Sequence, residues 1–133
     1  MSRNKRVMIV EDDHLNMKLF TDLLSLNGFD TIQKRDGTGA VETAREHQPD
    51  LVLMDIQLPG RSGLDIAQDL KSHDDLKHIP IIAITAFAHK KAEAVCLNHG
   101  CDGYISKPVS IHYFNEMIAE FVKSTRPQLR LVH

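Results

Sequence analysis

Three short apolar runs limit most strongly how this chain can fold. Every residue is apolar in Val7–Val10, Leu51–Met54 and Ile81–Ile84. A strand with one face in water alternates apolar and polar residues, whereas a continuous run is typical of a strand buried on both faces of a parallel sheet. Helices must cover both faces of such a sheet, so the runs predict an α/β fold.

Segments with helical periodicity lie between and after these runs. They are Leu15–Asn27, Gly39–His47, Ser62–Ser72, Ala88–His99 and a final segment whose apolar stripe extends from Ile111 to Val122. Gly28, Pro49 and Gly100 follow three of them as stop signals, and Ser110 is placed to cap the last. With weaker strands at Asp30–Gln33 and Gly103–Ser106, the alternation predicts an open, doubly wound parallel sheet with helices on both faces.

Length and charge narrow the class of protein. The chain has 133 residues and a net charge of −2. One domain is expected at residues 1–124, without room for a separate output module, and a flexible tail at 125–133, for which binding is the alternative role. The charge does not favour a nucleic-acid partner. The apolar run behind the basic N-terminus is too short for a signal peptide or membrane insertion, so we expect a cytoplasmic protein.

The two cysteines, Cys96 and Cys101, do not predict a metal site. They lie five positions apart, and no histidine completes a zinc-ligand spacing with them. We interpret both as small, semi-buried apolar residues in a reducing compartment. A redox pair is the alternative.

Polar side chains directly follow four of the predicted strands. They are Glu11, Asp12 and Asp13, then Asp55, Thr85 and Lys107. Right-handed crossovers bring the carboxyl ends of parallel strands to one edge of the sheet, where ligands bind. Asp13 alone could be a helix cap, and Thr85 alone an ordinary surface residue. As a set, these side chains predict a charged site.

Electrostatics indicates what that site binds. Two carboxylates about 4 Å apart repel each other by about 1–4 kcal/mol, so three together take up protons or bind a cation. Mg²⁺ prefers oxygen ligands and is commonly held by one or two carboxylates plus a phosphate. The acidic turn after the first strand has no glycine, which argues against a flavin- or dinucleotide-binding loop.

A carboxylate beside Mg²⁺, a hydroxyl and a lysine indicate phosphoryl transfer. Asp55 could attack a phosphorus atom to give an aspartyl phosphate. Lys107 could bind one phosphoryl oxygen as a point charge, and the Thr85 hydroxyl could donate to another. No histidine, cysteine or serine lies in these turns, because His14 should begin a helix, so an acyl-transfer triad has no support.

Residues 5–124 closely resemble the receiver domain of two-component response regulators. The motifs behind this resemblance are Val10–Asp13, Leu53–Pro59, Gly63, Ile84–Ala86 and Ser106–Pro108. The resemblance implies a flavodoxin-like (CheY-like) sheet of five parallel strands in the order 2-1-3-4-5. Asn16–Phe20, Asp74–Ala88 and Gly100–Pro108 look further like the DivK class of stand-alone regulators of cell division and cell fate.

The resemblance implies a signalling phosphoprotein of a phosphorelay rather than an enzyme with a separate substrate. Its partners would be a sensor histidine kinase or histidine phosphotransferase and a downstream protein target, and it would be a monomer or a weak homodimer. It would catalyse its own phosphorylation from phosphohistidine and lose the phosphoryl group slowly to water.

The same resemblance implies roles for the acidic residues. Asp55 would be the phosphoacceptor. Asp12 and Asp55 would bind Mg²⁺ directly, Glu11 through water, and Gln57 through its backbone carbonyl. Members of the family usually have aspartate at the position of Glu11, and the longer side chain could change how the metal is held.

Further roles follow for residues on the later strands. Thr85 and Lys107 would bind phosphoryl oxygens, and the peptide bond from Lys107 to Pro108 would be cis. Phosphorylation would draw Thr85 inward and make space for Tyr104, which is otherwise an ordinary half-buried tyrosine. The response would appear at the fourth helix, fifth strand and fifth helix, roughly Ala88–Lys123.

The resemblance also implies that two positions tune how fast the phosphoryl group is lost to water. One of them also helps to exclude other classes of protein. Gln57 and Phe87 each lie two residues past a catalytic position. Magnesium phosphohydrolases with an aspartyl nucleophile place a second aspartate where Gln57 stands, and Toprim-type domains use an Asp-x-Asp there, so both classes are disfavoured. A receiver-like interaction module that no longer turns over phosphate is a third alternative.

Overall fold

The structure is a computed structural model and describes residues 4–86 and 90–123. Five parallel strands form a single sheet in the order β2-β1-β3-β4-β5. The strands are β1 (Arg6–Val10), β2 (Asp30–Lys34), β3 (Leu51–Asp55), β4 (Ile81–Thr85) and β5 (Gly103–Ser106). The predicted fold and strand order are therefore confirmed.

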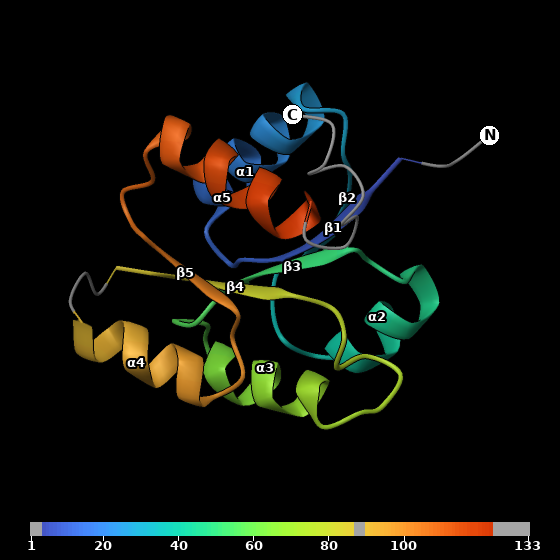
Figure 1. Cartoon of the computed structure of the whole chain (residues 1–133). Coiled ribbons are helices and arrows are strands. Elements are labelled where there is room, and N and C mark those ends of the chain that lie inside the picture. Colours follow the sequence, from blue (N-terminus) through green and yellow to red (C-terminus); the bar gives the residue numbers. More distant parts are fainter. Residues whose placement is uncertain (1–3, 87–89, 124–133) are drawn as a thin grey trace.

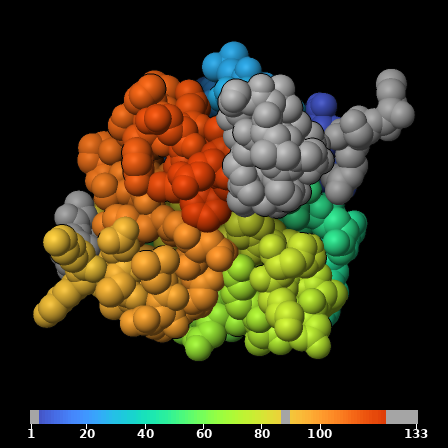
Figure 2. Space-filling view, viewed as in Figure 1, coloured from blue at the N-terminus to red at the C-terminus, as the bar shows by residue number. Residues whose placement is uncertain are grey.

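Helices cover both faces of the sheet (Figure 1). They are α1 (His14–Leu26), α2 (Ala40–His47), α3 (Gly63–Lys71), α4 (Lys90–Asn98) and α5 (Ile111–Lys123). α1 and α5 pack on one face, and α2, α3 and α4 pack on the other. α4, β5 and α5 adjoin one another on the surface seen in Figure 2.

Both faces of the central strands are buried, which explains the continuous apolar runs. In β1, Met8 and Val10 join the core beneath α2 to α4, while Val7 and Ile9 join the core beneath α1 and α5. β3 and β4 divide their side chains in the same way, and every residue of both strands is buried. Successive side chains of a strand point to opposite faces of the sheet, so each apolar run contributes residues to both cores.

The helices begin and end within one or two residues of the predicted positions. Capping residues explain several of the differences. Gly39 was expected inside a helix, but its φ of 70° is left-handed, so α2 begins at Ala40. Ser62 lies just outside α3, and its hydroxyl accepts a hydrogen bond from the Leu64 N–H. Ser110 caps α5, because its hydroxyl accepts from the Tyr113 N–H at 3.4 Å.

The cysteines are free and buried in the core beneath α2 to α4. Burial raises the pKa of the Cys101 thiol to about 12 and also raises that of Cys96. Thiols with such pKa values are poor nucleophiles at neutral pH, which agrees with their interpretation as small apolar residues.

Some predictions fall beyond what the structure describes. Phe87, the tail at 125–133 and the first two residues of the predicted fourth helix, 88 and 89, lie there. Within residues 4–86 and 90–123, no helix combines the length and the apolar character needed to cross a membrane.

Candidate phosphoacceptor site

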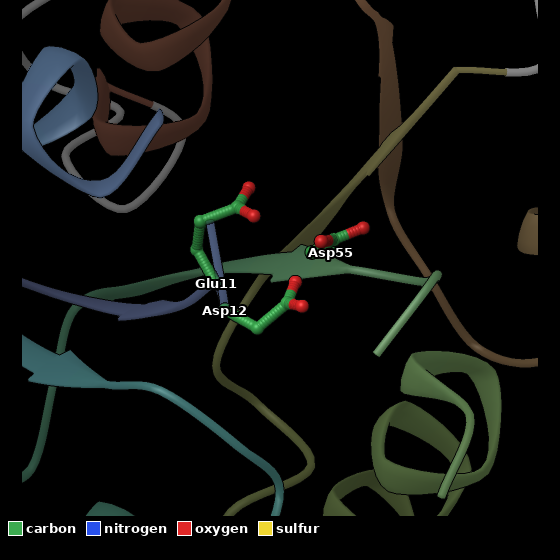
Figure 3. Close-up of side chains that lie close together, drawn as sticks. All are labelled: Glu11, Asp12 and Asp55. Carbon is green, nitrogen blue, oxygen red and sulfur yellow. The ribbon is translucent and has the colours of Figure 1, made fainter. Parts of the chain in front are cut away.

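The carboxyl edge of the sheet gathers the residues that the sequence singled out. β1 is followed by Glu11 and Asp12, β3 ends at Asp55, and β4 ends at Thr85. These strands pair in parallel, and the carboxylates of the three acidic residues supply oxygens that all lie within 4.8 Å of one another. Figure 3 shows the three side chains turned toward a common point.

Asp55 is held firmly at the centre of this edge. Its Oδ1 accepts a hydrogen bond of 2.9 Å from the Gln57 N–H, and its Oδ2 lies 3.5 Å from Lys107 Nζ. The residue is only 2% exposed, so its neighbours cover the carboxylate.

Gly63, at the start of α3, allows the backbone of Asp55 to lie where it does. A Cβ atom at residue 63 would collide with the carbonyl oxygen of Asp55 and with the Cα atom of Ile56. The Gly63 N–H also donates to the Ile56 carbonyl at 3.3 Å. The glycine in the family motif is thus required by the close packing of α3 on the end of β3.

Glu11 is a buried carboxyl group with few hydrogen-bond partners. It is 1% exposed, and its Oε2 accepts from the Asp13 N–H at 3.1 Å. Its Oε1 lies 3.2 Å from Lys107 Nζ without hydrogen-bond geometry, and it accepts no hydrogen bond from any described residue. Burial, together with the facing side chain of Asp55, raises the pKa of Glu11 to about 7.

The two aspartates that follow Glu11 have different tasks. Asp13 is the N-cap of α1, because its Oδ2 accepts from the Asn16 N–H at 2.8 Å. Asp12 is exposed and points toward Asp55 (Figure 3). The alternatives left open for this acidic run are therefore resolved as one cap and two site residues.

Lys107 reaches the site because of where β5 ends. Its N–H donates to the Thr85 carbonyl at 2.7 Å, which places the residue beside the end of β4. Its ammonium then lies between Glu11 and Asp55, and only 19% of its side chain is exposed. The peptide bond from Lys107 to Pro108 is cis. Sequence reasoning placed Lys107 beside Asp55 but did not anticipate its second contact, with Glu11.

Thr85 and Tyr104 lie on neighbouring strands. Thr85 is completely buried, and Tyr104 is partly buried against the core beneath α2 to α4. They are close in register, because Tyr104 pairs with Ala83 and Thr85 pairs with Ser106.

Gln57 makes a contact that sequence reasoning missed. Its side-chain Oε1 accepts a hydrogen bond of 2.9 Å from the Ala86 N–H, so it connects the ends of β3 and β4. No periodicity or motif could have indicated this contact, because the two residues are 29 positions apart.

The acidic cluster fits a hard divalent cation. It offers three carboxylates from two adjacent strands, and one of its buried oxygens lacks a hydrogen bond. That oxygen, Glu11 Oε1, faces the Lys107 ammonium at 3.2 Å, and a cation in the cluster would help to compensate its burial. Mg²⁺ suits this cluster, because all of the ligands are oxygens and water can reach the site beside the exposed Asp12.

The fold and this site define a receiver. The response regulator receiver domain family matches residues 7–119, and the chain belongs to that family. Among its relatives is the polar-differentiation response regulator DivK of Brucella anthropi. The two are 54% identical over 118 residues, which cover 89% of this chain and 96% of that protein.

Two solved structures show similar receivers in informative states. One is the receiver domain of a sensor histidine kinase from Pseudomonas aeruginosa, with magnesium coordinated in its active-site cleft. It is 26% identical to this chain and has a TM-score of 0.81. The match covers 90% of this chain and 98% of that one. The other is a receiver domain from Saccharomyces cerevisiae crystallised with a histidine phosphotransfer protein. It is also 26% identical with a TM-score of 0.81, covering 91% and 90% of the two chains.

Proposed function

We propose that this receiver accepts a phosphoryl group on Asp55 from a phosphohistidine of a sensor histidine kinase or histidine phosphotransferase. The observation that supports this most directly is the Asp55 carboxylate, which lies 3.5 Å from the Lys107 ammonium beside two further carboxylates. The yeast receiver, which was crystallised with a histidine phosphotransfer protein, supports a partner of this kind.

The transfer exchanges one bond for another. An Asp55 oxygen forms a bond to phosphorus as the bond from phosphorus to the histidine nitrogen breaks, and that nitrogen keeps the electron pair. Lys107 binds one phosphoryl oxygen and the Thr85 hydroxyl donates to another. Gln57, through its N–H, keeps the Asp55 carboxylate oriented during the attack.

Asp12, Asp55 and Glu11, with the backbone carbonyl of Gln57, would hold Mg²⁺. The ion, when bound, neutralises charge on the transferring phosphoryl group. A cation in the site would in turn favour the ionised form of the buried Glu11.

The output is a change of protein contacts. The added negative charge draws Thr85 toward the phosphoryl group, Tyr104 turns inward, and the surface of α4, β5 and α5 rearranges. That surface binds the downstream target. The similarity to DivK supports a role in cell-cycle or cell-division control.

Intact mass spectrometry tests the phosphoacceptor. With a small phosphoryl donor and Mg²⁺, the protein should gain one phosphoryl group, and either EDTA or the substitution Asp55→Asn should abolish the gain. Circular dichroism should show that Asp55→Asn leaves the fold intact. Continued labelling of that variant would place the acceptor elsewhere, and steady hydrolysis of small phosphoesters would favour a phosphohydrolase instead.

A further inference from the structure

One backbone donor at the carboxyl edge is occupied by a side chain instead of by the sheet. The Ile56 N–H donates to the Ile84 carbonyl, which is the last bond of the ladder between the extended ends of β3 and β4. The next bond of a parallel ladder would join the Ala86 N–H to the Ile56 carbonyl. That carbonyl instead accepts from Gly63, and the Ala86 N–H donates to the side chain of Gln57.

Gln57 therefore contacts both the phosphoacceptor and the neighbouring strand end. Its N–H donates to Asp55 Oδ1, and its side-chain Oε1 accepts from the Ala86 N–H, both at 2.9 Å. Because the carboxylate of Asp55 is 2% exposed, a group attached to it must displace something nearby. The bond between Gln57 and Ala86 is a candidate, because it belongs to the residue that donates to Asp55 and connects only an exposed side chain to an exposed residue.

A phosphoryl group would compete for this donor. It brings three strong acceptor oxygens and nearly two negative charges to the position beside Gln57. A charged oxygen is a stronger partner for an N–H than the oxygen of a neutral amide. The Ala86 N–H follows directly after the buried strand β4, so the backbone on its N-terminal side is anchored in the sheet.

We propose that the Gln57 side chain is a latch, which occupies the Ala86 N–H in the unmodified protein and must release it when Asp55 is phosphorylated. This rests on the proposed function and assigns Gln57 a positioning role in the closed state. Releasing the latch costs one hydrogen bond, so it weakens the binding of a phosphoryl group relative to a protein without it.

The test compares Gln57→Met with the wild-type protein and with Gln68→Met. Methionine has a similar shape but no amide, and Gln68 is exposed on α3. Beryllofluoride with Mg²⁺, an acyl phosphate mimic, is titrated into each protein and followed by amide NMR. Gln57→Met should bind it about three- to tenfold more tightly, the ratio expected for one net hydrogen bond, and Gln68→Met should bind as the wild type does.

The resonance of the Ala86 amide gives an independent readout. In the free protein, Gln57→Met should shift it upfield, because the N–H loses its acceptor, while Gln57→Glu should restore a downfield position and bind beryllofluoride more weakly than the wild type does. Equal or weaker binding by Gln57→Met, or an unchanged Ala86 resonance in that variant, would overturn the latch. Failure of the wild-type protein to bind beryllofluoride at all would overturn the phosphoacceptor and the latch together.

Discussion

At the scale of single residues, Lys107 decides how much negative charge the site can hold. Its ammonium lies 3.2 Å from Glu11 Oε1 and 3.5 Å from Asp55 Oδ2. Without this ammonium, the two buried carboxylates, which have oxygens within 4.8 Å of one another, would repel each other strongly. In the proposed function, the same ammonium also binds a phosphoryl oxygen, so one side chain would stabilise the site before and after phosphorylation.

Replacing this lysine should therefore slow phosphorylation far more than it alters the fold. We expect Lys107→Gln to lower the initial rate of phosphoryl incorporation by on the order of 100-fold, the size seen when a preorganised donor is removed. The rate is measured with a small phosphoryl donor by intact mass. The matched control is Lys18→Gln, because Lys18 is exposed on α1 and pairs with Asp22. A loss of less than about threefold in Lys107→Gln would contradict this role.

Glu11 predicts how stability depends on pH when no metal is present. Its pKa is about 7 in the folded protein and near 4.5 when solvated, so the folded state binds its proton more tightly. The free energy of unfolding should therefore fall as pH rises from about 4.5 to 7, by about 1–3 kcal/mol in total. Above that window the loss is complete.

Urea unfolding in EDTA at pH 5 and pH 8 measures this dependence. Glu11→Gln should reduce the difference between the two values, because its side chain does not titrate. Added Mg²⁺ should restore stability at pH 8 in the wild-type protein, since the cation favours the ionised carboxylate. Equal pH dependence in the wild type and in Glu11→Gln would contradict the assignment.

At the scale of elements, the contact between α3 and the end of β3 sets the position of Asp55, the proposed phosphoacceptor. The helix begins at Gly63 with its backbone against Asp55 and Ile56, and Ser62 caps it. An alanine is ordinarily better than glycine in a helix by about 1 kcal/mol. Here the close packing should reverse that order.

We expect Gly63→Ala to lower the free energy of unfolding by about 1–3 kcal/mol, since the new methyl group would collide with rigid backbone. It should also slow phosphorylation, because any relief of the collision moves Asp55. Urea unfolding and the labelling rate measure the two effects. Gln68→Ala, on the exposed side of the same helix, should change neither. A stabilised Gly63→Ala protein would show that α3 can move without cost.

At the scale of the whole molecule, the site extends across the carboxyl ends of β1, β3 and β4 to the residue after β5, and the proposed output surface lies on the β5 side of it. β4 and β5 are adjacent, and both run toward the site, with Thr85 paired to Ser106. Turning such a switch from mostly off to mostly on needs about 5.5 kcal/mol of differential stabilisation. Phosphorylation and partner binding can share that requirement.

Chemical-shift mapping tests where the response goes. On binding beryllofluoride with Mg²⁺, amide shifts remote from the site should concentrate in β4, α4, β5 and α5. They should be small in β2, at the other edge of the sheet. Tyr104→Ala should reduce the remote shifts without reducing the shifts at Asp55. A response of equal size at both edges would contradict the proposed output surface.

The sequence by itself determined the architecture of this protein. The runs Val7–Val10, Leu51–Met54 and Ile81–Ile84 indicated buried strands because apolar periodicity directly reflects burial on one face or two. Parallel connectivity then placed Asp12, Asp55, Thr85 and Lys107 at one edge, since crossovers are right-handed. The chemistry of these side chains then suggested phosphoryl transfer beside Mg²⁺. The resemblance to receivers gave each residue its specific role.

Only the tertiary structure decided how the side chains at that edge share their partners. It assigned Asp13 to a helix cap and Asp12 to the acidic cluster, placed Lys107 between Glu11 and Asp55, and joined Gln57 to Ala86. These contacts depend on directions and distances between residues up to 96 positions apart in sequence order, as from Glu11 to Lys107. Local sequence patterns record whether a residue is buried, but a side chain's partners are set by the packing of distant elements.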